Sequence, residues 1–397
     1  MLAQKVLIVL FVLLAGDSEC NAEDSDMKLA RAQNRFALKL LKELCSEEPE
    51  SNIFFSPTSI SVALAMVYAA ARGKSEAEIS IALGHTAALL PSRESTLESY
   101  KKFLAEQQTD DNVSLMIANA VFVQKKLKVL KSYRKELVDI FAAMYRSVDV
   151  RGEKSAMESE VNEWVKNKTK DQISGFKLPA GTITALLNAI YFKGQWETPF
   201  DLKYSFSFPF YNKGSEVVMV ETMSRDGTVL FTSEPGLKCE AIEHPYKGGR
   251  HSMIFVFPNE KNGLAELRQA ITVESIEKIL RNLKETVLMF QLPKFDLKTE
   301  YNLVPALKKL GVGSIFSDAD LSGIPGGEGQ VVTEVQHKAA IEINEEGTVA
   351  AAATAVRAGK NRTQSFVVNR PFLFYICEKA TGRLLFLGEV HALPAIK

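Results

Sequence analysis

The spacing of apolar residues changes from helical to strand-like along this chain of 397 residues, and that change limits the folds open to it. Residues 26–47 repeat apolar side chains at helical spacing. The stripe consists of Leu29, Phe36, Leu40 and Leu41. The second half instead contains the strand-like runs KCEAIEHPY, SMIFVFP, TVLMFQLPKF, AAIEIN, FLFYICE and RLLFLGEV. GLAELRQAI and TVESIEKILRNL interrupt them with helical patterns. Helices followed by strand-rich sequence predict an α+β fold with large antiparallel sheets.

A second helix is predicted over residues 56–73. Ser56 and Pro57 occupy N-cap and first-turn positions, the middle of the segment is apolar, and Gly73 is the expected stop. Strand-like runs follow at 119–123 and 186–192.

The N-terminus is typical of a secretory signal. Lys5 precedes the apolar run Val6–Gly16, and small residues follow at Ser18 and Cys20. The run is shorter than the ~20 residues that span a bilayer. We therefore predict a signal peptide over residues 1–20 and an extracellular, secreted protein.

Secretion bears on cysteines and glycans. Removal of the signal leaves three cysteines, so the chain is not a disulfide scaffold, although one bridge among them stays open. They are Cys45, Cys239 and Cys377. Three sequons are candidate glycosylation sites, which would make the chain a glycoprotein. Their asparagines are Asn112, Asn167 and Asn361.

Charge and motifs exclude several function classes. The chain has 48 basic and 48 acidic residues, so nothing draws it to nucleic acid or to a membrane surface. It lacks G-x-S-x-G, P-loop, H-E-x-x-H and C-x-x-C patterns, and its five histidines lack metal-ligand spacing. We predict neither an enzyme nor a metal or cofactor site.

One basic cluster has two interpretations. It comprises Lys125, Lys126, Lys128, Lys131, Arg134 and Lys135. It could bind a polyanion such as heparin weakly. The favoured alternative is the solvated face of an amphipathic turn and helix.

Five long segments, in chain order, resemble the serpin family. They are NIFFSPTSISVALAMVYAAARG, LLNAIYFKGQWETPF, EHPYKGGRHSMIFVFP, VVTEVQHKAAIEINEEGTVAAAATAV and VVNRPFLFYICEKATGRLLFLGEVHAL. The combination resembles secreted arthropod serpins, tick serpins among them. The resemblance implies one domain over residues 21–397, with about three β-sheets, eight or nine helices and an exposed reactive-centre loop at about 345–368. It also implies suicide inhibition, in which a serine protease acylates itself on the loop and the cut loop enters the main sheet.

The resemblance assigns roles to residues of this chain. Ser56, Ser59, Asn188 and His337 match the polar cluster where the strands of the main sheet part. Trp196 and Glu345 match the point of first insertion. Lys294, in QLPKF, is the candidate basic partner of Glu345. The hinge is matched by Glu345, Glu346, Gly347, Thr348, Ala350, Ala351, Ala352 and Ala353.

The composition of the ribbon EEGTVAAAATAV suits a strand that must enter a sheet. Alternation places Thr348, Ala350, Ala352, Thr354, Val356 and Ala358 on one uncharged face. Arg357 falls on the other face, where its charge avoids burial. Composition alone permits an alanine-rich helix equally well, and the flanking family motifs favour the strand. Small residues there match inhibitory members, with a non-inhibitory carrier as the alternative.

The residue before the cleaved bond sets the target. The tip offers Lys360, Asn361 and Arg362, and a basic residue suits a trypsin-like protease. Counting from Gly347 gives Asn361, and counting back from Pro371 gives Lys360. Chemistry favours a basic residue, and Arg362 by a small margin. We expect a monomer that forms covalent complexes with trypsin-like serine proteases.

Overall fold

The computed structural model describes residues 26–88, 90, 92–107, 113–125, 129, 131–148, 154–179, 181–322, 331–347 and 364–396. The predicted signal peptide, the sequons at Asn112 and Asn361, Lys126 and Lys128 lie outside these ranges. The loop positions from 348 to 363, with the candidate bait residues, also lie outside them.

The described ranges contain nine α-helices, in agreement with the predicted eight or nine. They are residues 26–47, α2 (Pro57–Ala70), α3 (Gly73–Leu83), α4 (Arg93–Glu106), α5 (Lys131–Phe141), α6 (Lys154–Lys168), α7 (Leu264–Ala270), α8 (Val273–Asn282) and α9 (Val304–Lys309).

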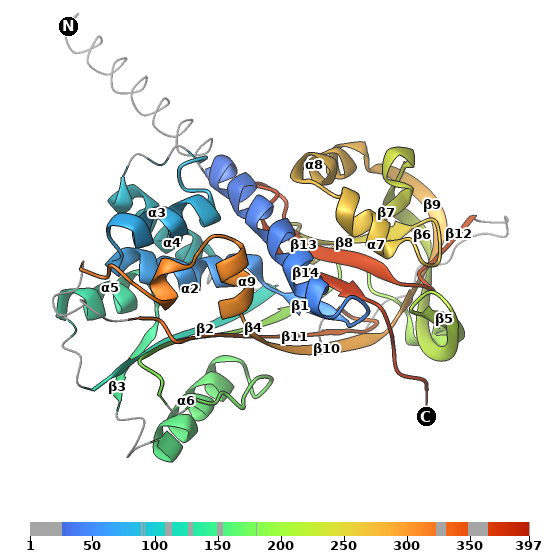
Figure 1. Cartoon of the computed structure of the whole chain (residues 1–397). Helices are drawn as coiled ribbons and strands as arrows, with labels where there is room; N and C mark the ends of the chain where they lie inside the picture. The colour runs from blue at the N-terminus through green and yellow to red at the C-terminus, as the bar shows by residue number, and fades with distance from the viewer. Residues whose placement is uncertain are drawn as a thin grey trace, which may run out of the picture.

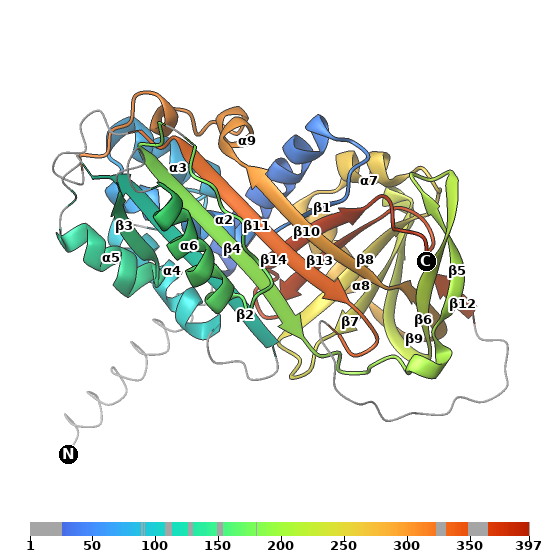
Figure 2. The same ribbon diagram turned by 90° about the horizontal axis from the view of Figure 1, so that it is seen from below.

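The strands of a five-stranded sheet run along the long dimension of the molecule (Figures 1 and 2). Its order is β10 (Phe295–Asn302), β11 (Glu334–Ile343), β4 (Thr184–Gly194), β2 (Val113–Gln124) and β3 (Met144–Val148). Helices α2 to α5 cover one face, and α6 crosses the other face over β2 and β4 (Figure 2).

The remaining strands form a nine-stranded sheet. Its path is β1 (Ile53–Phe55), β14 (Leu384–Val390), β13 (Phe372–Glu378), β8 (His251–Pro258), β7 (Cys239–Pro245), β6 (Glu216–Glu234), β9 (Lys284–Pro293) and β12 (Gln364–Val367), with β5 (Phe206–Asn212) paired to β6. β6 is 19 residues long and pairs with β5, β9 and β7 along its length. The expected third group of strands is therefore joined to the second by hydrogen bonds. The α+β fold class is confirmed.

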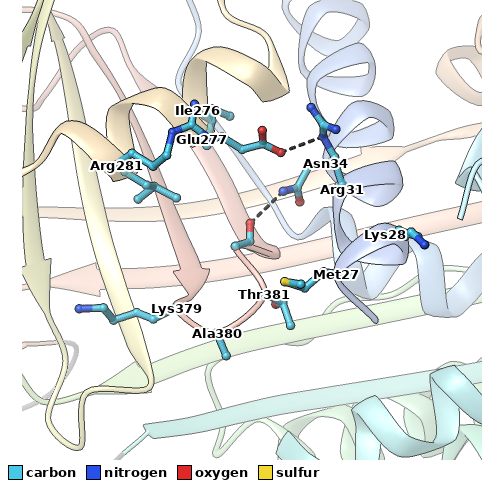
Figure 3. Close-up of a pocket in the computed structure, with 12 residues that line it drawn as sticks. Met27, Lys28, Arg31, Asn34, Ile276, Glu277, Arg281, Lys379, Ala380 and Thr381 are labelled. Atoms are coloured by element: carbon cyan, nitrogen blue, oxygen red, sulfur yellow. Dashed lines mark hydrogen bonds and ion pairs between the residues drawn. The ribbon is translucent and has the colours of Figure 1, made fainter. Parts of the chain in front are cut away.

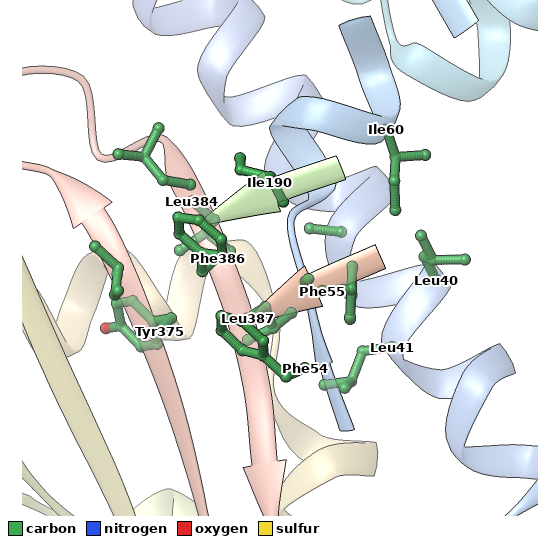
Figure 4. Close-up of a cluster of buried hydrophobic side chains, with 14 of the residues drawn as sticks. Leu40, Leu41, Phe54, Phe55, Ile60, Ile190, Tyr375, Leu384, Phe386 and Leu387 are labelled. Atoms are coloured by element: carbon green, nitrogen blue, oxygen red, sulfur yellow. The ribbon is translucent and has the colours of Figure 1, made fainter. Parts of the chain in front are cut away.

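Buried side chains lie on both faces of the five-stranded sheet. The larger cluster fills the space between this sheet, α2, the helix at 26–47 and β14 (Figure 4). Within it, Phe54 stacks on Phe386 with ring centroids 5.2 Å apart. The smaller cluster, which includes Val161 and Tyr191, lies beneath α6. All four predicted stripe residues of the first helix are buried. The alternation of β4 and β11 thus supplies two cores at once.

Helix α2 begins as its sequence predicts. The Ser56 hydroxyl accepts a hydrogen bond from the Ser59 N–H at 3.1 Å, and Pro57 opens the first turn. All 14 residues of the helix are buried. The prediction for Gly73 was wrong, because α2 ends at Ala70 and Gly73 begins α3. Gly73 has a φ of +53°, and this conformation belongs to the start of α3 and not to the end of α2.

The three cysteines of the described chain are free and buried, on separate elements. Burial raises the pKa of the Cys239 thiol to about 12 and moves those of Cys45 and Cys377 in the same direction. The thiols of Cys239 and Cys377 pack as small apolar groups, and that of Cys45 donates to the Glu389 carboxylate at 3.7 Å. Within the described ranges, no helix is both long enough and apolar enough to cross a bilayer.

Candidate site for sheet opening

Strands β11 and β4 are parallel neighbours at the centre of the five-stranded sheet, and we call their contact the seam. Pairing runs from Glu334 opposite Ala185 to Ala340 opposite Tyr191. Beyond this point β11 still pairs with β10 as far as Ile343, and β4 still pairs with β2 as far as Gly194. The last three residues of β11 and of β4 therefore do not pair with each other. We call this end of the seam, towards Ile343 and Gly194, its upper end.

A buried polar network crosses the lower seam. The Asn188 amide nitrogen donates to Ser59 Oγ at 2.5 Å and to Asn119 Oδ1 at 2.6 Å. Its oxygen lies 2.5 Å from Nδ1 of His337 on β11. The Ser56 N–H donates to Nε2 of His337 at 3.1 Å. The network joins both seam strands to the start of α2, and it brings together the four residues predicted from the resemblance.

These contacts fix the form of His337. Nε2 accepts from a backbone N–H, so the proton lies on Nδ1 and is donated to the Asn188 oxygen. Burial lowers the pKa of His337 to about 3, which keeps the ring neutral at physiological pH. A second proton on Nε2 would face the Ser56 N–H, donor against donor.

A tight turn follows β11 at residues 344–347, which we call the hinge turn. Three successive carbonyls of this turn are held from the segment after β4. The Trp196 indole N–H donates to the Asn344 carbonyl at 3.1 Å, and the Trp196 backbone N–H donates to that of Glu346 at 2.9 Å. The Phe200 N–H donates to the Glu345 carbonyl at 2.8 Å. The hinge turn is thus fastened to the top of β4 rather than to β11.

Only glycine fits at position 347. Its φ is +133°, and an added Cβ would lie 2.2 Å from the Gly194 carbonyl oxygen and 2.9 Å from the Trp196 nitrogen. Bridges to Gln195 and Asn344 hold it there. Gly347 is therefore required for close approach of two backbones as well as for its dihedral angle.

A partly buried ion pair closes the hinge turn. Lys294 Nζ lies 2.7 Å from Glu345 Oε1 and 2.7 Å from Glu221 Oε1, and the Ser205 hydroxyl donates to Glu345 at 2.5 Å. The predicted Lys294–Glu345 pair is confirmed. Burial alone would raise the pKa of Glu345, but the bonds from Lys294 and Ser205 outweigh it and lower that pKa.

This arrangement matches one known family. The sequence of residues 31–393 matches the model of the serpin (serine protease inhibitor) family. The chain belongs to the serpin family. Iripin-2 of the tick Ixodes ricinus is 40% identical over 384 residues, which cover 94% of this chain and 96% of the relative. Intracellular coagulation inhibitor 2 of the horseshoe crab Tachypleus tridentatus is 34% identical, with 94% and 93% covered. The predicted likeness to arthropod serpins is confirmed.

Solved serpin structures superpose over nearly the whole chain. Human thyroxine-binding globulin, solved with thyroxine, gives a TM-score of 0.87 at 28% identity, covering 94% of this serpin and all of that chain. Serpin48 of the insect Tenebrio molitor gives 0.81 at 31% identity, with 92% and 98% covered.

Sequence reasoning missed several residues of the opening site in this serpin. Asn119, Ser205 and Glu221 complete the networks above, and none has a motif of its own. His244 was noted only as one of five histidines. It lies fully buried on β7 beneath Trp196, with the ring centroids 4.5 Å apart. Its place after an acid in EHPYKG, a strand-like run, was the one available signal.

Other predicted residues lie apart from this site. Asn167 is exposed near the end of α6, as a glycan acceptor must be, and its glycosylation stays a prediction. In the basic cluster, Lys131, Arg134 and Lys135 are exposed on α5, where Lys135 pairs with Asp139 at 3.5 Å. Exposure fits both interpretations of the cluster.

A surface pocket of about 440 Å³ lies between the helix at 26–47, α8 and the turn after β13 (Figure 3). Met27, Ile276 and Leu280 give it apolar walls, and Lys28, Arg31, Arg281 and Lys379 lie around it. Arg31 is paired with Glu277 at 2.8 Å. The pocket is remote in sequence from the seam and shares no residue with it.

Proposed function

We propose that this serpin traps serine proteases covalently. Its loop, at about 345–368, is cut by the protease and then enters the seam between β11 and β4. The observation that carries the proposal is the seam itself. Two parallel strands are paired directly, they separate at the end where the hinge turn lies, and the ribbon of small residues follows that turn.

Insertion is favourable for a physical reason. A strand descending from the hinge turn would run antiparallel to both β11 and β4. One parallel pairing would be replaced by two antiparallel pairings, which are slightly more stable per residue. The uninserted form is then a kinetic trap. The side chains at 348, 350 and 352 are small enough to pass between the parted strands.

The target is a trypsin-like protease. Lys360 and Arg362 offer the cation that such a protease holds against a buried acid in its specificity pocket. Secretion by the signal at 1–20 would place the serpin with extracellular proteases. The protein would then be an inhibitor rather than an enzyme. We also propose that it acts as a monomer.

Mixing the intact serpin with trypsin tests the proposal. We expect an adduct that survives boiling in detergent, and cleavage without any adduct would refute trapping. Mass spectrometry of the released C-terminal peptide would identify the bait residue among Lys360, Asn361 and Arg362, because the peptide begins at the next position. Asn361 stays on the N-terminal fragment after cleavage at Arg362, so a tryptic digest of the intact serpin would show whether Asn361 carries a glycan that obstructs docking.

Two matched variants test insertion separately from docking. Thr348→Arg places a charge on the face that enters the core, so we expect cleavage with less than a tenth of the normal adduct. Val349→Arg places the same charge on the opposite face and should keep most of the adduct. Equal yields from both variants would contradict the predicted alternation.

The basic cluster at 125–135 keeps its two interpretations within this proposal, a weak polyanion site and the favoured solvated face. A polyanion site predicts that heparin accelerates trypsin trapping modestly and that Lys131→Glu with Lys135→Glu removes the acceleration. An unchanged rate with heparin would leave the cluster as a solvated face.

A carrier function is the second candidate, favoured by the surface pocket. Its apolar walls and surrounding cations suit an amphipathic organic anion. Thyroxine-binding globulin shows that this fold can carry such a ligand. Thyroxine binding should weaken at least tenfold in Arg281→Glu and persist in Lys39→Glu, on the exposed face of the neighbouring helix. Absence of binding in the intact serpin would remove this candidate.

A further inference from the structure

His244 occupies an aromatic box. Its ring centroid lies 4.5 Å from that of Trp196, 5.3 Å from that of Phe200 and 5.8 Å from that of Phe290. The side chain is fully buried, and its Nε2 has no hydrogen-bond partner. A buried nitrogen without a partner is costly to keep. Neither protease trapping nor the surface pocket accounts for it.

Two walls of the box also hold the hinge turn. The Trp196 indole N–H donates to the Asn344 carbonyl, and the backbone N–H groups of Trp196 and Phe200 donate to those of Glu346 and Glu345. These are three consecutive carbonyls of the turn. A displacement of the enclosed imidazole must move one or both rings, because the box is closely packed. The imidazole is therefore linked to the hinge turn through the Trp196 ring, whose indole N–H holds the Asn344 carbonyl.

The charges around the box disfavour a protonated imidazole. Burial and, to a smaller extent, the positive charge of Arg225 on β6 lower the pKa of the His244 ring well below its usual value. The walls from β8 and β9 contribute Met253 and Phe290, which are uncharged. The hinge carboxylate of Glu345 is already bound by Lys294. A proton on the ring would thus create a buried cation without a counter-ion among these neighbours.

We propose that His244 is an acid-sensitive latch on the hinge turn. When the ring takes up a proton it leaves the box for water, the Trp196 ring shifts, and its indole N–H releases the Asn344 carbonyl of the hinge turn. Acid then favours opening of the upper seam. The latch stands on the geometry of the box, and only its consequence for loop insertion rests on the proposed inhibitory function.

The sign and size of the effect follow from linkage. The ring has a pKa near 6.5 when hydrated and a lower one in the closed box. The ratio of closed to opened molecules is therefore constant above about pH 6.5 and falls by up to about tenfold for each pH unit below it. Between pH 6.5 and 4.5 the opened population should rise by as much as ~100-fold.

Tryptophan fluorescence of the full-length serpin tests the latch. The chain has two tryptophans, so Trp164→Phe leaves Trp196 as the reporter. Acrylamide quenching of Trp196 should rise at least twofold, reversibly, from pH 7.5 to 4.5. Adding His244→Leu, which fills the box with an uncharged side chain, should abolish that rise. His244→Met provides the same comparison if the leucine variant does not fold.

A control and a second readout separate the outcomes. His85 is also buried, but it lies between α3 and α4 and bonds Tyr100, so His85→Leu should keep the response of Trp196. A synthetic peptide of the sequence 345–358 should enter the sheet at least tenfold faster at pH 5 than at pH 7.5, and His244→Leu should remove the difference. A pH response that persists without His244 overturns the latch. Trypsin adducts formed at pH 7.5 without any such response refute the latch alone, whereas a response without adducts refutes trapping alone.

Discussion

His337 in the lower seam and His244 beside the upper end are both buried and both neutral, but their nitrogens are treated differently. Both nitrogens of His337 are hydrogen-bonded, to Ser56 and to Asn188. Nε2 of His244 has no partner, and its neighbours are aromatic rings. Separating the lower seam would strand several buried polar groups at once, whereas separating the upper end mainly exposes rings and one ion pair. For the loop insertion that we propose, we therefore expect the seam to open first at its upper end, beside His244, and last at the polar network around His337.

Removal of the central amide should give the largest effect. Asn188→Ala leaves His337 Nδ1, Ser59 Oγ and Asn119 Oδ1 without this partner, so we expect the free energy of unfolding to fall by about 3–5 kcal/mol. Urea unfolding at pH 7.5 measures it. Ser59→Ala is the control, with an expected loss of about 1 kcal/mol. A loss below ~1 kcal/mol in Asn188→Ala would show that the lower seam is not held by this network.

Acid should weaken the lower seam through His337. Its pKa is about 3 in the folded protein against 6.5 unfolded, so the unfolded chain binds the proton first as pH falls. The stability that depends on the neutral ring is complete above pH 6.5 and declines from there towards pH 3. About 2 kcal/mol should be lost by pH 5. Urea unfolding measures the free energy of unfolding at pH 7.5 and 5.0. The decrease between these pH values should be about 2 kcal/mol smaller in His337→Gln than in the wild type, and an equal decrease in both proteins would contradict the assignment.

Displacing the hinge turn should cost less than breaking the lower network. Gly347→Ala brings a Cβ against the Gly194 carbonyl, so the turn must leave its site, at a cost of about 1–2 kcal/mol. Acrylamide quenching of Trp196 should increase. Gly311→Ala is a matched control, because Gly311 also has a positive φ, of +92°, but open space around its Cβ position. Similar quenching in both variants would argue that backbone strain, and not the close contact, is responsible.

The ion pair of the hinge turn should give the smallest effect. Lys294→Met removes the contacts to Glu345 and to the exposed Glu221, but the buried Glu345 keeps its bond from Ser205, so we expect a loss of about 1 kcal/mol at low salt. The loss should shrink in 1 M NaCl because solvent ions screen the pair. Lys203→Met, which removes a surface pair with Asp201, should change stability by less. A salt-independent loss would mean that packing of the lysine stem matters more than its charge.

Sequence patterns identified most elements because those signals are local. Ser56 and Pro57 mark the start of α2, and the apolar stripe of residues 26–47 marks a buried helix face. Gly73 was misassigned because glycine punctuates the start of one element as readily as the end of another. The family resemblance added the residues of the lower seam and the partner of Glu345, which no local pattern could have paired.

The sequence by itself determined which segments form helices and strands and where small residues replace bulky ones. Only the tertiary structure decided which distant groups meet. Asn188 and His337 are 149 positions apart, and Glu345 lies in the hinge turn whereas Lys294 lies between β9 and β10. His244 becomes a candidate latch only when β7 is packed beneath Trp196. Local propensities act within a few residues, whereas strand order and register bring remote side chains within hydrogen-bonding distance.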